Sequence, residues 1–500
     1  MALSIYWAGL LVPMPLVVLL IGHRMISRLF QRGKLQEEAA AHDVEAKEFR
    51  KTFLRVYLVV MGSEWLQSPY IYSLLREEKA IEERGVATLY IATYVSAALS
   101  AFLTGYMADR FGRKRACLAF CGIHSLASIS VKFDAMWILM TGRVLSGIGL
   151  NLLWTSFESW MVTEYNARAL YQSSLPLSAM FGIMTKYNCI TAIFAGSISY
   201  SIVLVSGSKS NPFVVGVCLD GAAALLILWT WNENNGASCN HDSSGQDDIG
   251  CDTTSKVLDD RAAVTLRDTR IWVLSFASCC FEGTMFIFTF FWPGSLKGAH
   301  NTEYPEHSET TPYGVIFASF MAAMVLGAIL FSFFIRNANC VITERATTFG
   351  AIWPTLLLCM ALFLGASSFL IAALFKAELH LYLTFLLLEF CNGVYVPAMA
   401  YHRGILVEDS RRASTYGLMN IPLFVFVVAA LYTTSSNGDE HRQTVFSLSA
   451  VLLLAAAVSV ALGLGMSAIR PGFSRVMNND AHDIESVDKD ELALDGVDQV

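Results

Sequence analysis

Long runs of apolar residues, separated by short polar breaks, dominate the chain. A helix needs roughly 20 apolar residues to cross a ~30 Å hydrocarbon core, and about thirteen runs reach that length. The first covers residues 3–22. The others lie at residues 53–74, 86–107, 115–132, 136–162, 176–205, 212–231, 269–292, 313–335, 350–374, 380–401, 414–433 and 443–468. The pattern predicts an all-α membrane protein that crosses the bilayer thirteen times.

A polar segment at residues 232–268, rich in Gly, Ser and Asp and without helical periodicity, interrupts the spans. It divides the twelve later spans into six and six. We therefore predict five parts: an N-terminal membrane anchor with its cytosolic linker (1–52), a six-helix half (53–231), a cytosolic central linker (232–268), a second six-helix half (269–468) and an acidic cytosolic tail (469–500).

Basic residues near the first run set the expected orientation. His23, Arg24 and Arg28 follow it, where a cleaved signal peptide would carry small residues, so we expect the run to remain as an anchor. Because loops rich in Lys and Arg stay in the cytosol, the N-terminus is predicted outside and the C-terminus in the cytosol.

Composition narrows the class of protein. With 54% hydrophobic and 15% charged residues and a mean hydropathy of +0.48, the chain is too apolar for a soluble protein. The net charge of -7 comes largely from the tail, and no basic patch indicates nucleic acid. We find no nucleotide loop, catalytic triad or metal-binding helix motif, so we expect no enzyme activity, no cofactor and no metal. Cys239, His241 and Cys251 in the central linker lie among solvated residues, which favours disorder over a metal site.

The break between the second and third core spans carries a motif with the pattern Gly-x-x-x-Asp-Arg-x-Gly-Arg-Lys. Its residues are Gly105, Asp109, Arg110, Gly112, Arg113 and Lys114. Glycines permit close helix approach and turns, and Asp109 can pair with a cation or cap a helix. The motif resembles the signature loop of the major facilitator superfamily, and Arg143-x-x-x-Gly147-x-Gly149 resembles that superfamily's membrane-embedded motif. The resemblance implies a major facilitator fold with a cytosolic gate; the alternative is a plain positive-inside loop.

A closer resemblance covers residues 53–468. The segments Glu64–Tyr72, Phe157–Trp160, Phe281–Phe288, Phe317–Ala323 and Leu388–Pro397 are similar to hallmark segments of the eukaryotic molybdate-anion transporter family. That family also carries an additional N-terminal hydrophobic segment. The resemblance implies a secondary carrier that imports molybdate with high affinity at the cell membrane by alternating access of its two halves.

Ionisable residues inside spans are candidates for the substrate site, because each costs at least ~2.5–3.5 kcal/mol to insert. Arg143 is the first choice for contact with an oxyanion, since a guanidinium offers fixed, forked donors. Glu158 lies fifteen residues further along the same helix, on the same face and about 22 Å away. The alternative for Arg143 is a structural salt bridge, for example to Glu389.

Two further carboxylates occupy matching positions in the halves: Glu64 in the first core span and Glu282 in the seventh. Buried carboxylates can carry protons at physiological pH, which would suit proton-coupled uptake. A buried hydrogen bond that fixes helix packing is the equal alternative.

The remaining candidates have weaker support. Glu389, Gly393 and Pro397 indicate a helix that bends, and bending is the favoured role of this helix. Lys186 can add positive potential at the site or pair with Glu158, and Gln67 can donate to an oxyanion. The aromatic run at residues 286–292 is expected to contact lipid or its interface.

Three classes of function remain open: a molybdate carrier, a carrier of another small solute such as sulfate, an organic anion or a sugar, and a membrane receptor or scaffold without transport. The intramembrane charges argue against the last class, because a scaffold gains nothing from their insertion cost. The partners that we expect are the oxyanion, the lipid bilayer and protons as a coupling ion, with the chain acting as a monomer.

Overall fold

A computed structural model of the chain describes residues 2–15, 17, 40–170, 177–234, 269–305, 311–341, 349–406, 412–434 and 438–465. Within these ranges it contains thirteen helices of ten residues or more and no strand. The predicted fold class, an all-α membrane protein with two six-helix halves and one additional N-terminal helix, is confirmed. Most of the central linker, the acidic tail and the end of the predicted first span lie outside the described residues.

The helix bounds follow the predicted runs closely. In the first part of the chain the helices are α1 (Ala2–Leu11), α3 (Ala40–Gln67), α5 (Glu83–Phe111), α6 (Arg113–Ser130), α7 (Met136–Ala167), α8 (Leu177–Ser206) and α9 (Asn211–Thr230). In the second part they are α11 (Thr269–Glu303), α12 (Tyr313–Val341), α13 (Phe349–Leu374), α14 (Glu378–Leu406), α15 (Arg412–Tyr432) and α16 (Gly438–Val460). A short helix α4 (Ile71–Ser73) and a π-helical turn (Leu74–Glu78) connect α3 to α5.

By length and hydropathy alone, eight of the described helices are able to span a membrane: α7, α8, α9, α11, α12, α13, α14 and α16. Two shorter apolar helical stretches are Ile5–Pro15 in the region of α1 and Pro422–Tyr432 in α15. α11 extends past Pro293 to Glu303, although its apolar run ends at residue 292. The extension is held by tertiary contacts, since Glu303 accepts a hydrogen bond from the backbone N–H of Glu378 at 3.2 Å.

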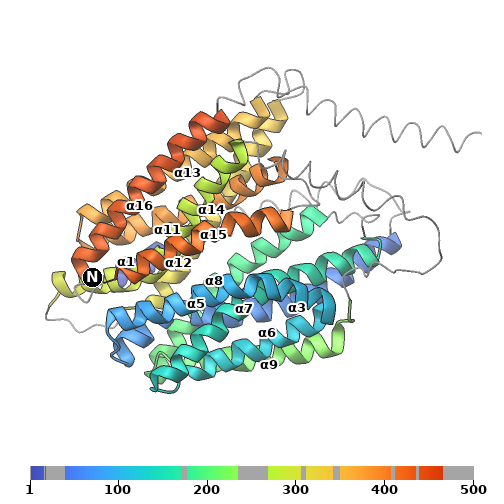
Figure 1. Cartoon of the computed structure of the whole chain (residues 1–500), viewed down its shortest axis with the longest axis horizontal. Coiled ribbons are helices and arrows are strands. Elements are labelled where there is room, and N and C mark those ends of the chain that lie inside the picture. Colours follow the sequence, from blue (N-terminus) through green and yellow to red (C-terminus); the bar gives the residue numbers. More distant parts are fainter. Residues whose placement is uncertain are drawn as a thin grey trace, which may run out of the picture.

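The two sets of six helices lie side by side, with α3–α9 in blue to green and α11–α16 in yellow to red (Figure 1). The largest contacts between the halves are those of α8 with α12 and of α5 with α15, and α4 also contacts α11. The first pair is very close, because a Cβ added at Gly314 would lie 2.3 Å from the carbonyl oxygen of Gly196. Glycine at these positions lets the two halves meet backbone to backbone.

The halves are joined at one end of the bundle, here called the Glu83 end, where α3 finishes and α5 begins. At the opposite end, the Gly112 end, α5 turns into α6. Every hydrogen bond and ion pair between described residues of the two six-helix halves lies at the Glu83 end, and the helices of the halves diverge away from it (Figure 1). The structure is therefore a state closed at the Glu83 end.

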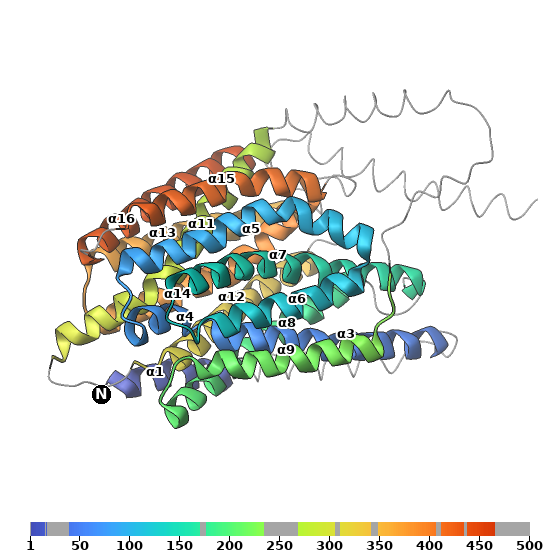
Figure 2. The ribbon, with the colours of Figure 1, turned by 60° about the horizontal axis from the view of Figure 1, so that its bottom comes forward.

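Helix α1 packs on the two six-helix halves at the Glu83 end (Figure 2). The Tyr6 hydroxyl donates a hydrogen bond to Glu378 of α14, and its ring meets that of Tyr382 edge to face with centroids 4.8 Å apart. Trp7 contacts Tyr200 of α8, with ring centroids 6.1 Å apart. The N-terminal helix thus contacts both halves.

The aromatic run on α11 is not where the sequence pattern indicated. Phe288, Phe290, Phe291 and Trp292 are all buried, so the expectation of lipid or interface contact is wrong for them. Phe290 packs edge to face on Tyr72 and Tyr90 of the other half, at centroid distances of 5.4 and 5.0 Å. Phe288, Phe291 and Trp292 instead pack on aromatic rings of their own half, which periodicity alone does not reveal.

Candidate functional site

Arg143 lies in the second turn of α7, counted from the Glu83 end, and its side chain is half-buried. Among the residues that the structure describes, none accepts a hydrogen bond or forms an ion pair with its guanidinium. Its electrostatic neighbours are Glu64 and Tyr90, which lie close enough for their charges to interact with it. A guanidinium without a bonded carboxylate retains its donors for an anion.

Glu64 forms a cluster with two residues from other helices, here called the His124 cluster. His124 of α6 lies between two carboxylates: its Nε2 is 3.1 Å from Glu64 of α3, and its Nδ1 is 2.8 Å from Asp220 of α9. The Asp220 side chain is completely buried, whereas Glu64 keeps 30% of its side-chain surface exposed. The cluster therefore joins three helices, and Glu64 links it electrostatically to Arg143.

Glu282 in the second half has a similar arrangement with a different cation. Arg403 of α14 donates to its carboxylate at 2.8 Å, and Ser278 and Tyr395 add hydrogen bonds of 2.9 and 3.1 Å. The first core helix of each half thus carries a carboxylate bonded to a basic side chain on another helix of its own half, His124 for Glu64 and Arg403 for Glu282. Arg403, which the sequence pattern predicts in the cytosolic loop after the tenth core span, lies inside α14 instead.

Glu389 and Gln67 are both buried. Glu389 accepts a hydrogen bond of 3.1 Å from Asn392, one turn along α14, and no ion pair joins it to Arg143 among the described residues. Gln67 accepts from Ser128 of α6 at 2.8 Å, while its Nε2 has no partner in the described part of the chain. Both side chains therefore form hydrogen bonds at the contacts between packed helices or along one helix, and neither bonds Arg143.

Glu158 and Lys186 lie further towards the Gly112 end. The Glu158 side chain is exposed, and within the described residues no hydrogen bond or ion pair involves it. Lys186, half-buried on α8, forms no ion pair with Glu158. The structure places Arg143 and Glu64 together and does not bring the other candidates to them.

The motif at the Gly112 end fastens α5 and α6 to the end of α9. Gly112 has a φ of 102°, which an L-residue rarely adopts, and α6 starts at the next residue. Lys114 donates to the carbonyl of Trp231 at 2.6 Å, and Glu233 accepts from the Lys114 backbone N–H at 2.9 Å. The lysine thus neutralises the partial negative charge at the α9 C-terminus.

Two other residues of the motif are placed by the structure. Arg113 donates to the carbonyl of Ser159 on α7 at 3.1 Å, and Arg110 is exposed at the end of α5. Gly105 and Asp109 lie in α5, but the Asp109 side chain is outside the described part, so its predicted pairing is not tested.

At the Glu83 end an ion pair here called the clasp closes the halves. Arg442 of α16 donates to both carboxylate oxygens of Glu83 at 2.8 and 3.0 Å, and also to the carbonyl of Gly294 at 3.1 Å. Only 4% of the Glu83 side chain and 13% of the Arg442 side chain are exposed. Such buried, bidentate geometry is strong and specific.

A second group at the same end, here called the Glu77 cluster, lies outside the predicted spans. Glu77 accepts hydrogen bonds from Lys209 and Tyr313, and from Lys297 at 2.9 Å. Burial raises the pKa of Glu77, but these bonds outweigh burial and hold the pKa below its usual range. The cluster thus adds a hydrogen bond and an ion pair between the two halves.

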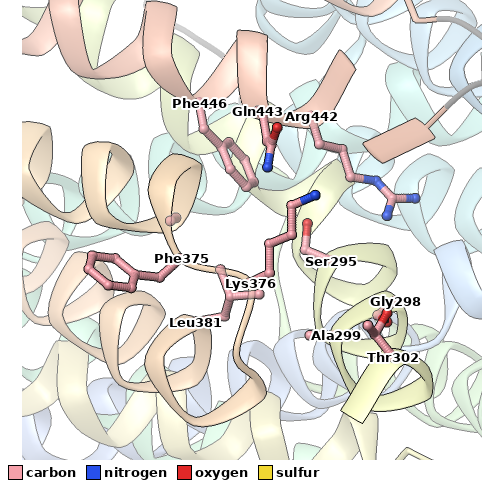
Figure 3. Close-up of a pocket in the computed structure, with 11 residues that line it drawn as sticks. Ser295, Gly298, Ala299, Thr302, Phe375, Lys376, Leu381, Arg442, Gln443 and Phe446 are labelled. Carbon is pink, nitrogen blue, oxygen red and sulfur yellow. The ribbon is translucent and has the colours of Figure 1, made fainter. Parts of the chain in front are cut away.

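A pocket at this end lies within the second half, between α11, the α13–α14 loop and α16 (Figure 3). Lys376, Ser295 and Gln443 line it, together with Phe375 and Phe446. Arg442, at its edge, is bonded to Glu83 and so belongs to the clasp. The pocket is separate from Arg143 and the His124 cluster. No group of three or more His, Cys, Asp or Glu in the described residues can hold a metal ion.

The sequence analysis missed His124 and Asp220, although a signal was present. Both lie inside apolar runs, at residues 115–132 and 212–231, where the insertion cost that singled out Glu64 applies equally. What the sequence does not contain is their mutual contact, since 96 residues separate them.

The fold defines a class: two six-helix halves that are closed at one end form the architecture of a major facilitator carrier. Comparison with known proteins agrees. The family described as sugar transporters with 12 transmembrane segments matches residues 16–394, and the chain belongs to that family.

Curated relatives share most of their length with the chain. The molybdate-anion transporter of Danio rerio is 28% identical over 442 residues, covering 83% of this chain and 86% of the relative. That of Takifugu rubripes is 26% identical over 472 residues, covering 89% and 92%.

Solved transporters share the fold at low identity. A peptide transporter in complex with sulfate has a TM-score of 0.60 at 12% identity, covering 86% of this chain and 95% of that chain. The nucleoside transporter NupG has a TM-score of 0.57 at 12% identity, covering 83% and 98%. These likenesses support the fold alone.

Proposed function

We propose that the protein is a secondary carrier that imports molybdate across the cell membrane by alternating access of its two halves. The observation that carries the proposal is Arg143: a guanidinium inside the membrane region that no described residue binds. Glu64 lies close enough to interact with the charge of Arg143 but accepts no hydrogen bond from it among the described residues, so the guanidinium donors remain available to an anion. The names of the curated relatives indicate which anion, namely molybdate.

Molybdate is a tetrahedral dianion, and a guanidinium offers it two parallel N–H donors. Arg143 is placed by α7 below the aromatic contacts of the Glu83 end, in which its neighbour Tyr90 packs on Phe290 of the other half. An anion at Arg143 therefore lies close to the contact between the halves. Such a position allows bound substrate to influence which end of the carrier is closed.

In this proposal the Glu83 end faces outwards and the Gly112 end faces the cytosol. The positive-inside rule supports this orientation, because the Gly112 end carries Arg110, Arg113, Lys114 and Arg115 in one short turn. The N-terminus is then outside and the acidic C-terminal tail in the cytosol. Alternation requires the clasp and the Glu77 cluster to break when the outer end opens. A single chain supplies both halves of the site, so we propose a monomer as the working unit.

The test is uptake of labelled molybdate by proteoliposomes that contain the full chain. Charge-assisted hydrogen bonds contribute about 1.5–3 kcal/mol, so Arg143→Ala is expected to lower uptake about 10- to 150-fold. Arg143→Lys keeps the charge but not the forked donors, so its uptake is expected to lie between that of Arg143→Ala and that of the unaltered chain. The control is Arg84→Ala, an exposed arginine on α5, with uptake like that of the unaltered chain.

Two results would overturn the proposal. Uptake by Arg143→Ala equal to that of the unaltered chain would remove the assigned role of Arg143. Absence of molybdate uptake by the unaltered chain, or full inhibition by an equal concentration of sulfate, would remove molybdate as the substrate.

A further inference from the structure

His124 has an unusual environment, because each of its two ring nitrogens faces a different carboxylate. Nε2 lies 3.1 Å from Glu64, and Nδ1 lies 2.8 Å from Asp220. The imidazole ring also stacks on Phe120, with centroids 5.2 Å apart and planes 13° from parallel, which fixes its orientation. Both contacts are therefore made at once by one fixed ring.

The number of protons in this arrangement follows from hydrogen-bonding chemistry. A neutral imidazole has one N–H donor and one acceptor nitrogen, whereas an ionised carboxylate only accepts. Two carboxylates at hydrogen-bond distance from the two nitrogens require either an imidazolium with two N–H donors or a proton on one carboxyl group. The His124 cluster in this structure thus holds one proton more than a neutral histidine with two carboxylates.

The other groups that face the cluster come from every helix packed against α6. On α9, Asp220 also accepts a hydrogen bond of 3.3 Å from Ser125, and Cys121 lies near it. On α3, the Ser63 hydroxyl is 3.5 Å from Nδ1. On α7, Arg143 interacts with Glu64, and Tyr90 of α5 interacts with Arg143. Arg143 is the cation that reaches the cluster from outside it.

Glu64 is thus shared between two cations, His124 and Arg143. Because Asp220 is completely buried and additionally bonded to Ser125, it is the fixed partner of the imidazole, and Glu64 is the partner that can leave. The Glu64 side chain is 30% exposed, so it is less confined than that of Asp220. When Nε2 loses its proton, its lone pair faces the oxygens of Glu64 and the contact becomes repulsive.

We propose that His124 is the proton-binding site of the carrier, and that Glu64 couples the proton to the anion by moving between His124 and Arg143. This inference rests on the proposed function. With His124 protonated, Glu64 stays on the imidazolium and Arg143 is available to the anion. When the proton leaves Nε2 for solvent, Glu64 pairs with Arg143 and displaces the anion. One proton moves and no bond other than N–H is made or broken.

Coupling of this kind is reciprocal: the proton favours the anion as much as the anion favours the proton. The carrier then moves one proton together with each anion, in the same direction. A difference of one pH unit across the membrane is worth about 1.4 kcal/mol for one proton, so it can drive about tenfold accumulation of the anion at zero membrane potential.

The experiment uses the full chain in proteoliposomes and two measurements. The first is exchange of labelled for unlabelled molybdate at equal pH on both sides, between pH 5.5 and 8. The second is accumulation driven by an imposed pH difference, acid outside. For the unaltered chain, exchange is expected to fall as the pH rises, and accumulation is expected to approach tenfold per pH unit.

The variants separate the roles of the two residues. Glu64→Gln removes the competitor of the anion, so exchange is expected to continue at all pH values without a pH profile, and gradient-driven accumulation is expected to vanish. His124→Gln leaves Glu64 to Arg143, so exchange is expected to be low throughout, and the double variant is expected to restore it without a pH profile. A purely structural role of His124 would not be rescued by Glu64→Gln.

The control is His300→Gln, which alters another buried histidine. His300 contacts one carboxylate, Glu378, at 3.0 Å, while its Nε2 has no partner among the described residues. The pH profile is expected to persist in this variant. A pH profile retained in Glu64→Gln, or one absent from the unaltered chain while molybdate still exchanges, would overturn the coupling and leave the carrier function standing. No molybdate exchange by the unaltered chain would instead refute the proposed function.

Discussion

The clasp between Glu83 and Arg442 provides the most direct test of how the closed end is held. Glu83→Gln keeps the shape of the side chain but removes its charge, so Arg442 loses its ion pair with this residue while its hydrogen bond to the carbonyl of Gly294 remains. The pair exists only while the two halves are together. The substitution is therefore expected to weaken the closed state relative to the state open at the Glu83 end.

The size of the effect follows from burial. Removing one partner of a buried ion pair costs about 3–5 kcal/mol. Because the clasp lies at the edge of the bundle and Arg442 keeps a second acceptor, we expect about 2–3 kcal/mol, which shifts the equilibrium between the two states about 30- to 150-fold.

The assay is electron paramagnetic resonance between two spin labels, one at Arg84 on α5 and one at Thr444 on α16, in a background without accessible native cysteines. Both positions are exposed at the Glu83 end. The unaltered chain is expected to give one short distance, and Glu83→Gln a second, longer one. The control is Asp134→Asn, which breaks the exposed ion pair with Lys79 inside one half.

The double variant Glu83→Gln with Arg442→Met completes the cycle, because it removes the guanidinium as well. It is expected to recover part of the short distance, since an apolar side chain does not leave a buried charge. An unchanged distance distribution in Glu83→Gln would refute the view that the clasp holds this end closed.

Two further predictions concern the same closed state and the helix packing beneath it. Because its partners lower the pKa of Glu77, the stabilisation from the Glu77 cluster is present above the ordinary carboxyl pKa of about 4.3 and is lost as the pH falls through the lowered value. The spin-label distance should therefore be constant from pH 7 to pH 5 and lengthen only in stronger acid. Lengthening between pH 7 and pH 6 would contradict this assignment. A methyl group at Gly393 would lie 1.9 Å from the carbonyl oxygen of Met324, so Gly393→Ala should lower the thermal stability of the purified protein by about 1–3 kcal/mol. Gly122→Ala, where nothing lies within 4 Å, is the control, and equal melting temperatures for both variants would show that the α12–α14 contact is not close.

The pattern of apolar runs was enough to place nearly every helix, because the cost of leaving backbone polar groups unbonded in lipid permits little but helices. Its errors lie where packing decides. α11 continues through Pro293 because contacts at its end hold it, and α3 begins at Ala40, well before its apolar run. The aromatic side chains of α11 are buried against their own half and, at Phe290, against the other half, which their identity alone did not distinguish from lipid contact.

The sequence by itself determined that this protein is a bundle of membrane helices in two halves. It also identified Glu64, Arg143 and Glu282 as candidate functional residues, because the cost of inserting a charge follows from the residue type and its position within an apolar run. Only the tertiary structure decided which charges meet. In the structure Glu282 pairs with Arg403, and His124 contacts both Glu64 and Asp220. Arg143 lies beside them without a bonded partner among the described residues. Partners on different helices are set by how the helices pack, and no local pattern records that packing.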